Sequence, residues 1–250
     1  MLKPPTAALA LSAALTALPV PSRALTPGEE MVLTVTYLGL PTGEGRIAVG
    51  QPEGDILPLV FQARTRGVVG FLDIREHLVA YWDGATQLSR GSDLKAIELG
   101  DFHQDASRFD REKGQITVVV ERKGRRTEKT VPCPADAQDL TTSFMWLRLQ
   151  PLAVGQRYEI PVCSGTDTFT LAADVLGRER VDTDAGKFDA LRVKVRTALK
   201  GNFSTKRDTF LWFSDDPRHV LVKVEADFAI GSIVAKLKSY RPGDQVATAR

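Results

Sequence analysis

Two adjacent carboxylates, Asp215 and Asp216, are the residues of this 250-residue chain best suited by type and spacing to acid–base chemistry. Paired carboxylates can share a proton or flank a bond under attack. Adjacent residues of a strand point to opposite faces, however, and Ser214-Asp215-Asp216-Pro217 has the composition of a turn whose side chains bond backbone amides. We therefore expect a turn here, with a role in binding an anion or calcium, or in hydrolysis, as the alternative.

The other residue types that carry chemistry show no functional spacing. His77, His103 and His219 lie far apart in the sequence, without the close spacing of metal ligands. The sequence also lacks a G-x-S-x-G nucleophile elbow and a glycine loop followed by a helix that could bind phosphate. We therefore predict no catalytic residue, no metal and no cofactor.

The three tryptophans, Trp82, Trp146 and Trp212, are candidates for contact with a ligand. On a concave sheet they could line an apolar or saccharide pocket. Large aromatic side chains more often fill a core, however. The sequence leaves both interpretations open for each of them.

The first 24 residues have the features of a secretory signal peptide. Lys3 precedes an apolar run over residues 7–20, and Ser22 to Ala24 offer small residues for a cleavage after Ala24. The run is shorter than the roughly 20 apolar residues of a membrane span, and no later stretch is long and apolar enough. We therefore expect a periplasmic or secreted protein with no transmembrane span in the mature chain.

Charge gives no support to nucleic-acid binding. The chain has 33 Lys and Arg against 31 Asp and Glu. Removing the leader takes away Lys3 and Arg23 and no acid, which leaves 31 of each. A mature chain without net charge lacks the overall basic balance that attracts a polyanion.

Cys133 and Cys163 are the two cysteines of the chain. In an oxidising compartment such a pair is expected to form a disulfide. By restricting the unfolded chain, a bridge of this span contributes roughly 3–4 kcal/mol to stability.

Alternating apolar and polar residues predict a mainly β protein. In residues 222–228, for example, valine, alanine and phenylalanine alternate with charged residues, as in a half-buried antiparallel strand. About a dozen such segments follow one another through hairpin-length turns, which predicts an antiparallel meander forming a curved sheet, barrel-like or sandwich. We expect one domain over residues 25–240 and a flexible tail at 241–250. Residues 87–109 are poor in apolar side chains and are expected to form long edge strands or an excursion of the sheet.

One helix is predicted, over residues 139–149. Asp136 or Asp139 can cap its first turn, an apolar stripe follows, and Pro151 ends it. The stripe comprises Leu140, Phe144, Leu147 and the neighbouring Trp146. Burial of the stripe against the sheet is expected to hold the helix in place. Near the end of the helix, Arg148 is expected to pair with the Arg178-Glu179 segment.

Four motifs in order give the chain a resemblance to a known family. They are Gln138-Asp139-Leu140-Thr141-Thr142 with Trp146-Leu147-Arg148, Gly177-Arg178-Glu179 with Ala185-Gly186-Lys187-Phe188, Trp212-Phe213-Ser214-Asp215-Asp216, and residues 230–237. Together with Gly28-Glu29 and Tyr37-Leu38-Gly39, this pattern resembles the bacterial exported family "domain of unknown function 3108". The resemblance implies a β-rich envelope protein and supplies no activity or catalytic residue.

The sequence thus favours an exported cell-envelope protein without catalytic activity. It would bind a hydrophobic or saccharide ligand or an envelope protein, or have a structural role. The alternative is a hydrolase of envelope polymers that uses carboxylates such as Asp215 and Asp216.

Overall fold

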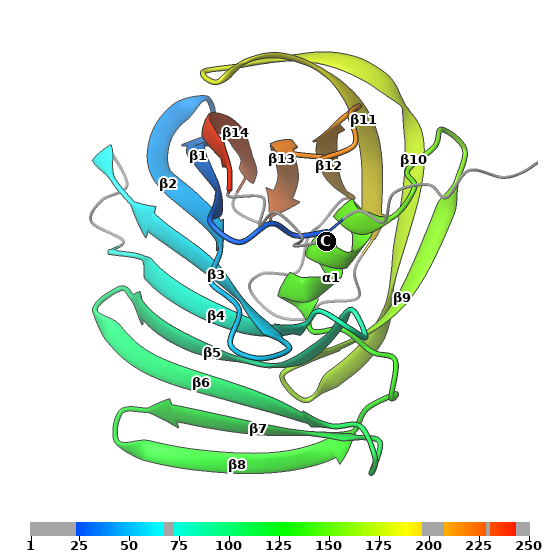
Figure 1. Ribbon diagram of the computed structural model, residues 1–250. Helices are drawn as coiled ribbons and strands as arrows, with labels where there is room; N and C mark the ends of the chain where they lie inside the picture. The colour runs from blue at the N-terminus through cyan, green and yellow to red at the C-terminus, as the bar shows by residue number, and fades with distance from the viewer. Residues whose placement is uncertain (1–23, 68–72, 197–207, 229–230, 244–250) are drawn as a thin grey trace, which may run out of the picture.

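The computed structural model describes residues 24–67, 73–196, 208–228 and 231–243 (Figure 1). The predicted leader, apart from Ala24, and residues 244–250 of the predicted tail lie outside the described residues. The first strands are β1 (Glu29–Tyr37), β2 (Leu40–Val49), β3 (Ile56–Thr65), β4 (Arg75–Asp83), β5 (Leu88–Glu98), β6 (Asp101–Asp110), β7 (Gln115–Arg122) and β8 (Arg125–Pro132). After α1 (Leu140–Leu149) come β9 (Arg157–Ser164), β10 (Asp167–Thr183), β11 (Gly186–Arg196), β12 (Thr209–Ser214), β13 (Leu221–Phe228) and β14 (Gly231–Pro242).

All fourteen strands belong to one antiparallel sheet. Its order is β8-β7-β6-β5-β4-β3-β2-β1-β14-β13-β12-β11-β10-β9. Within β1–β8 and within β9–β14, each strand pairs with its neighbours in sequence. The pairing of β1 with β14 joins the two runs, so that β8 and β9 are the edges. The predicted antiparallel, barrel-like meander with one packed helix is therefore confirmed.

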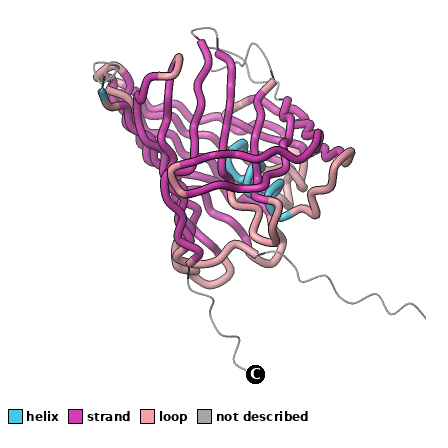
Figure 2. The backbone as a smooth tube through the Cα atoms, turned by 90° about the horizontal axis from the view of Figure 1, so that it is seen from above, coloured by secondary structure: helices cyan, strands magenta, loops and turns pink. Residues whose placement is uncertain are grey.

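Helix α1 lies inside the curve of the sheet (Figures 1 and 2). Its N-cap is Asp139, whose carboxylate accepts hydrogen bonds from the backbone amides of Thr141 and Thr142 at 2.8 and 2.9 Å. The helix ends at Leu149, and its C-cap is Gln150, directly before Pro151. The predicted helix is confirmed, with Asp139 as its cap.

The helix packs against both sides of the curled sheet. On one side, Leu147 lies in a buried cluster with residues of β9–β12, among them Leu191 and Phe213. On the other side, Met145 packs with Leu59 of β3 and Trp82 of β4. The core therefore lies between α1 and two facing parts of one sheet.

Strands β6 and β5 occupy interior positions of the sheet, third and fourth from the β8 edge when β8 is counted as the first. The prediction of edge strands or an excursion over residues 87–109 is therefore wrong. An interior strand is usually recognised by an apolar face, but the inner faces of β5 and β6 carry polar side chains, including Ser92, His103 and Asp105. Their low apolar content reflects this polar inner face rather than an edge position.

The segment after β8 ties the two edges together. Cys133 and Cys163 lie at disulfide distance, with their Cα atoms 6.2 Å apart. Next to them, the backbone amide of Gln138 donates a hydrogen bond to the carbonyl oxygen of Pro161 at 2.9 Å. The backbone amide of Cys163 in turn donates to the carbonyl oxygen of Gln138, also at 2.9 Å. Near the C-terminus, strand β14 extends to Pro242, which is two residues into the tail predicted for residues 241–250.

Candidate ligand cavity

A cavity of about 400 Å³ lies between α1 and the inner face of the sheet. Its walls come from β1–β4 and from β12–β14, and helix α1 covers one side. Most of the lining is apolar, including Leu33, Phe61 and Leu78 from the strands and Leu140 and Phe144 from the helix. Such a lining favours an apolar occupant, because burying apolar surface is the main driving force of association.

Small residues leave this space open. Gly45 of β2 and Ala63 of β3 lie directly opposite each other and both line the cavity. A Cβ atom added at Gly45 would meet the carbonyl oxygen of Gln62 at 3.9 Å, which is an ordinary contact. The strand therefore has room for a larger side chain at this position, and glycine leaves that room to the cavity.

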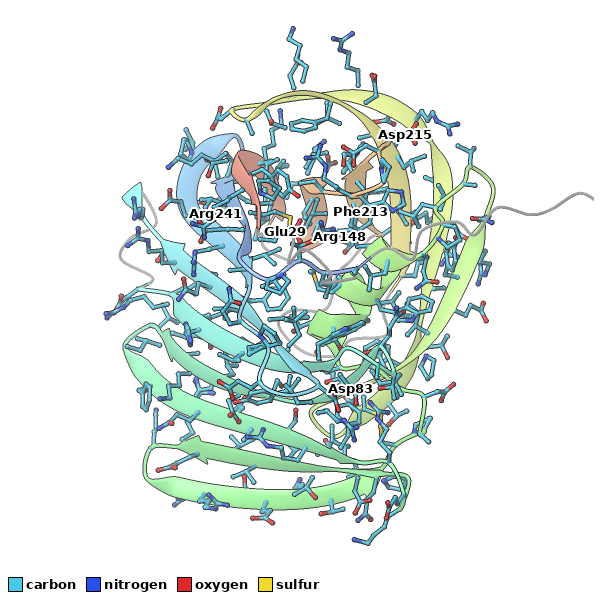
Figure 3. The ribbon with its side chains drawn as sticks, in the orientation of Figure 1. Glu29, Asp83, Arg148, Phe213, Asp215 and Arg241 are labelled. Carbon is cyan, nitrogen blue, oxygen red and sulfur yellow. A yellow bond between two sulfur atoms is a disulfide. The ribbon has the colours of Figure 1, made fainter. Side chains whose placement is uncertain are left out.

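A buried ion pair borders the cavity at the end of α1. Arg148 and Glu29 have side chains that are only 4 % and 2 % exposed, and their groups form two hydrogen bonds, one of them from Nη1 to Oε2 at 2.9 Å (Figure 3). The Tyr240 hydroxyl donates to Glu29 Oε1 at 2.8 Å. Burial, with the charge and hydrogen bond of Glu29, raises the pKa of Tyr240 to about 12. Both charges are thus satisfied within the protein.

Arg148 also anchors the helix to the turn between β12 and β13. Its Nε donates to the carbonyl oxygens of Arg218 and His219 at 3.0 and 2.9 Å. The expected pairing of Arg148 with the Arg178-Glu179 segment is wrong. Glu179 instead accepts hydrogen bonds from Arg192 and Trp212, and Arg178 pairs with Asp215. Sequence motifs place these charges on neighbouring elements but cannot select the partner.

The structure places Asp215 and Asp216 in the turn after β12, as predicted. Each carboxylate has its own arginine: Arg178 lies 2.6 Å from Asp215, and Arg218 lies 3.0 Å from Asp216. Burial raises the pKa of Asp216, but hydrogen bonds from the side chain and backbone of Arg218 lower it further, so that the net shift is downward. Neither residue lines the cavity. Two carboxylates with separate cationic partners are poorly placed to share a proton.

None of the three candidate tryptophans lines the cavity. Trp82 is buried in the core with Met145. Trp146 packs its ring edge-on against Tyr158 with 6.2 Å between the ring centroids. Trp212 is buried and donates its indole hydrogen bond to Glu179 at 2.9 Å. These positions correspond to the core interpretation that the sequence left open.

The sequence did not single out the residues that shape the cavity. Gly45, Ala63 and Glu76 lie next to one another across β2, β3 and β4, and all three border the cavity. A glycine inside a predicted strand can mark a close approach or an open space, and Gly45 gave this signal. Ala63 and Glu76 gave none, because their proximity depends on strand register.

A curled antiparallel sheet around a single packed helix, with an apolar cavity between them, defines a β-barrel-like protein. The chain belongs to the family described as protein of unknown function DUF3108, whose model matches residues 32–238. No curated protein matches the chain in sequence. In the part of the chain that the structure describes, no helix has the length and apolar character needed to cross a membrane.

Solved structures share the fold. A β-barrel-like protein of domain of unknown function DUF1849 from Brucella abortus superposes with a TM-score of 0.63 at 10 % identity, covering 89 % of this chain and 100 % of that one. A candidate exported protein with a YmcC-like fold from Bacteroides fragilis has a TM-score of 0.35 at 12 % identity, covering 88 % and 98 %. A candidate lipoprotein from Parabacteroides distasonis has 0.32 at 12 %, covering 88 % and 97 %. The first likeness bears on the fold, and the other two scores are too low to add to it.

Proposed function

We propose that this protein binds a small apolar or amphiphilic molecule in the cavity between α1 and the sheet. The cavity itself is the observation that carries the proposal. Its volume of about 400 Å³ lies within the roughly 300–1,000 Å³ of small-molecule sites. Its lining is apolar apart from a few polar groups at the margin, as in sites that recognise a hydrophobic ligand.

Binding without catalysis fits the polar groups that border the cavity. Among the described lining residues, the charged side chains are Arg46, Glu76 and Arg148. Arg46 pairs with Glu30, and Arg148 pairs with Glu29. A nucleophile beside a base, the arrangement that covalent catalysis needs, is absent from this described lining.

The proposal places the protein outside the cytoplasm, in the cell envelope or beyond it. The leader over residues 1–24 supports export. The Cys133–Cys163 pair at disulfide distance supports an oxidising compartment. An exported protein with an internal apolar cavity could move or hold a molecule that water dissolves poorly.

Filling the cavity tests the proposal. The neutral apolar dye N-phenyl-1-naphthylamine is expected to bind the wild-type protein with increased fluorescence. In Gly45→Leu the new side chain projects into the cavity, and we expect dye affinity to fall at least about tenfold, since displaced apolar contacts of this size are worth about 1.5–3 kcal/mol. A fluorescence titration measures the change.

Gly177→Leu is the matched control. A Cβ at Gly177 meets no atom within 4 Å, so this variant adds the same side chain to a strand away from the cavity and is expected to bind the dye normally. Thermal unfolding of both variants shows whether they are folded. Wild-type affinity in a folded Gly45→Leu protein would contradict the proposal.

A further inference from the structure

One row of residues runs across the inner face of the sheet beside the cavity. Ala63, Glu76, Ala96 and His103 lie directly opposite one another on β3, β4, β5 and β6. Directly opposed residues of antiparallel strands project from the same face. The two alanines therefore leave room on either side of Glu76, which itself borders the apolar cavity.

Two more carboxylates share this face. Glu98 lies two residues after Ala96 on β5, and Asp105 lies two residues after His103 on β6, so both point to the same side as their neighbours. Asp105 lines a second cavity of about 260 Å³ that shares Leu78 with the first. We call Glu76, Glu98, His103 and Asp105 the polar inner wall.

Among the described residues, several polar atoms of the polar inner wall have no hydrogen-bond or ion-pair partner. His103 is 8 % exposed, and its Nδ1 is buried without a hydrogen bond. The Oδ1 atom of Asp105 is buried and unpartnered as well. Glu76 and Glu98, which are partly buried, take part in none of the ion pairs between described residues, although polar groups withdrawn from water in folded proteins are nearly always paired.

On the outer face of the same sheet, some acidic side chains form ion pairs. There Glu44 lies 2.6 Å from Lys238, and Asp93 lies 2.8 Å from Arg108. On the inner side, Arg122 lies opposite His103, and its guanidinium is 3.7 Å from Asp101. Ion pairs thus engage these two outer acids, whereas Glu76 and Glu98 on the inner side form none with described residues.

An unpaired buried carboxylate costs free energy in its charged form. Burial, followed by the neighbouring charge of Glu98, raises the pKa of Glu76, and burial likewise raises that of Asp105. A cation bound from outside the chain would offset this cost. Within the described chain, His103 lowers the pKa of both carboxyl groups and Arg122 lowers that of Asp105, but the effect of burial is larger than that of these charges.

We propose that the ligand is an amphiphile whose polar end is a protonated amine, with its tail in the apolar cavity and its ammonium group at the polar inner wall. This inference rests on the proposed function. An ammonium group donates hydrogen bonds in several directions, which suits acceptors spread over β4, β5 and β6. No three His, Cys, Asp or Glu side chains of the described residues are grouped closely enough to hold a metal ion, whereas a polyatomic cation does not need them to converge.

Competition among three ligands of equal chain length tests the headgroup. Dodecylamine, dodecanol and dodecanoate are titrated against bound N-phenyl-1-naphthylamine at neutral pH. We expect dodecylamine to displace the dye at the lowest concentration and dodecanoate at the highest. In Glu76→Gln the advantage of the amine over the alcohol is expected to fall about tenfold or more, because a hydrogen bond to a charged group is lost.

Glu121→Gln is the control, since Glu121 is an exposed carboxylate on the outer face of β7. It should leave the preference for the amine unchanged. Asp105→Asn serves as a second variant should Glu76→Gln fail to fold. Equal displacement by amine and alcohol, or a preference unaffected by folded wall variants, would overturn the headgroup assignment and leave the proposed function standing. A wild-type protein that binds neither dye nor ligand would overturn both.

Discussion

Arg148 joins three parts of the molecule through one side chain. Arg148 lies in the last turn of α1. Its side chain pairs with Glu29 at the start of β1 and donates hydrogen bonds to the backbone of the turn before β13. Taking two charges out of water is costly and is offset only when both are fully hydrogen-bonded. The hydroxyl group of Tyr240 donates a further hydrogen bond to Glu29. We regard this cluster as the anchor that fixes the helix beside the cavity.

Removing one charge of this pair should destabilise the protein strongly. In Glu29→Gln, Arg148 stays buried without its anion, and we expect the free energy of unfolding to fall by roughly 3–5 kcal/mol. Glu30→Gln is the matched control, because Glu30 pairs with Arg46 at side-chain exposures of 22 % and 40 %, and an ion pair in contact with solvent contributes about 0–1 kcal/mol. Chemical denaturation measures both. Equal stability of the two variants would show that the cluster is not the anchor.

At the scale of the element, α1 depends on its first turn. Asp139 is buried, caps the helix and accepts a further hydrogen bond from Ser89 of β5 at 2.5 Å. Burial raises its pKa, although the hydrogen bonds from Ser89 and Thr142 oppose the shift. The cap therefore links the helix to the strand that carries part of the polar inner wall.

Two substitutions of the N-cap residue Asp139 distinguish the effect of its hydrogen bonds on stability from the effect of its charge. Asp139→Ala removes the acceptor, and we expect a loss of roughly 1–2 kcal/mol in unfolding free energy. Asp139→Asn keeps an acceptor for the first-turn amides and removes a charge that burial disfavours, so its loss should be clearly smaller. Denaturation curves of the two variants provide the comparison. An asparagine variant as unstable as the alanine variant would contradict this account of the cap.

Several elements could be predicted from local sequence. The alternation in residues 222–228 predicted β13, and the Asp139 cap with Pro151 predicted α1, because these signals act within one strand or one turn. Strands β5 and β6 were misplaced, since the usual apolar face of an interior strand is absent where the inner face is polar. The partner of Arg148 could not be predicted, because Glu29 lies 119 residues away in the sequence.

At the scale of the whole molecule, the meander leaves two edge strands, which are a risk for aggregation. Strand β8 carries Arg125, Arg126, Glu128 and Lys129, and such charges discourage further strand pairing. The backbone of Gln138 bonds to the β9 segment, and the Cys133–Cys163 pair joins the two edges. These contacts hold the sheet in a curve around α1, which is the condition for a cavity between the sheet and the helix.

The cavity could not be predicted from the sequence, because it depends on how distant strands come together. Its lining comes from seven strands and the helix, and its volume depends on small residues such as Gly45 and Ala63 meeting in register. The tryptophans drew attention as possible ligand contacts, yet they lie outside it. Local pattern identifies strands, whereas the space between them follows from the curvature of the complete sheet.

The location of a bound ligand tests the central claim most directly. A crystal of the protein grown with a long-chain alcohol that carries a terminal bromine would show the bromine by its anomalous signal. We predict a peak inside the cavity, between Phe144 of α1 and Phe61 of β3, and no such peak in Gly45→Leu. A peak on the outer surface alone, at a ligand concentration that saturates binding in solution, would contradict the account.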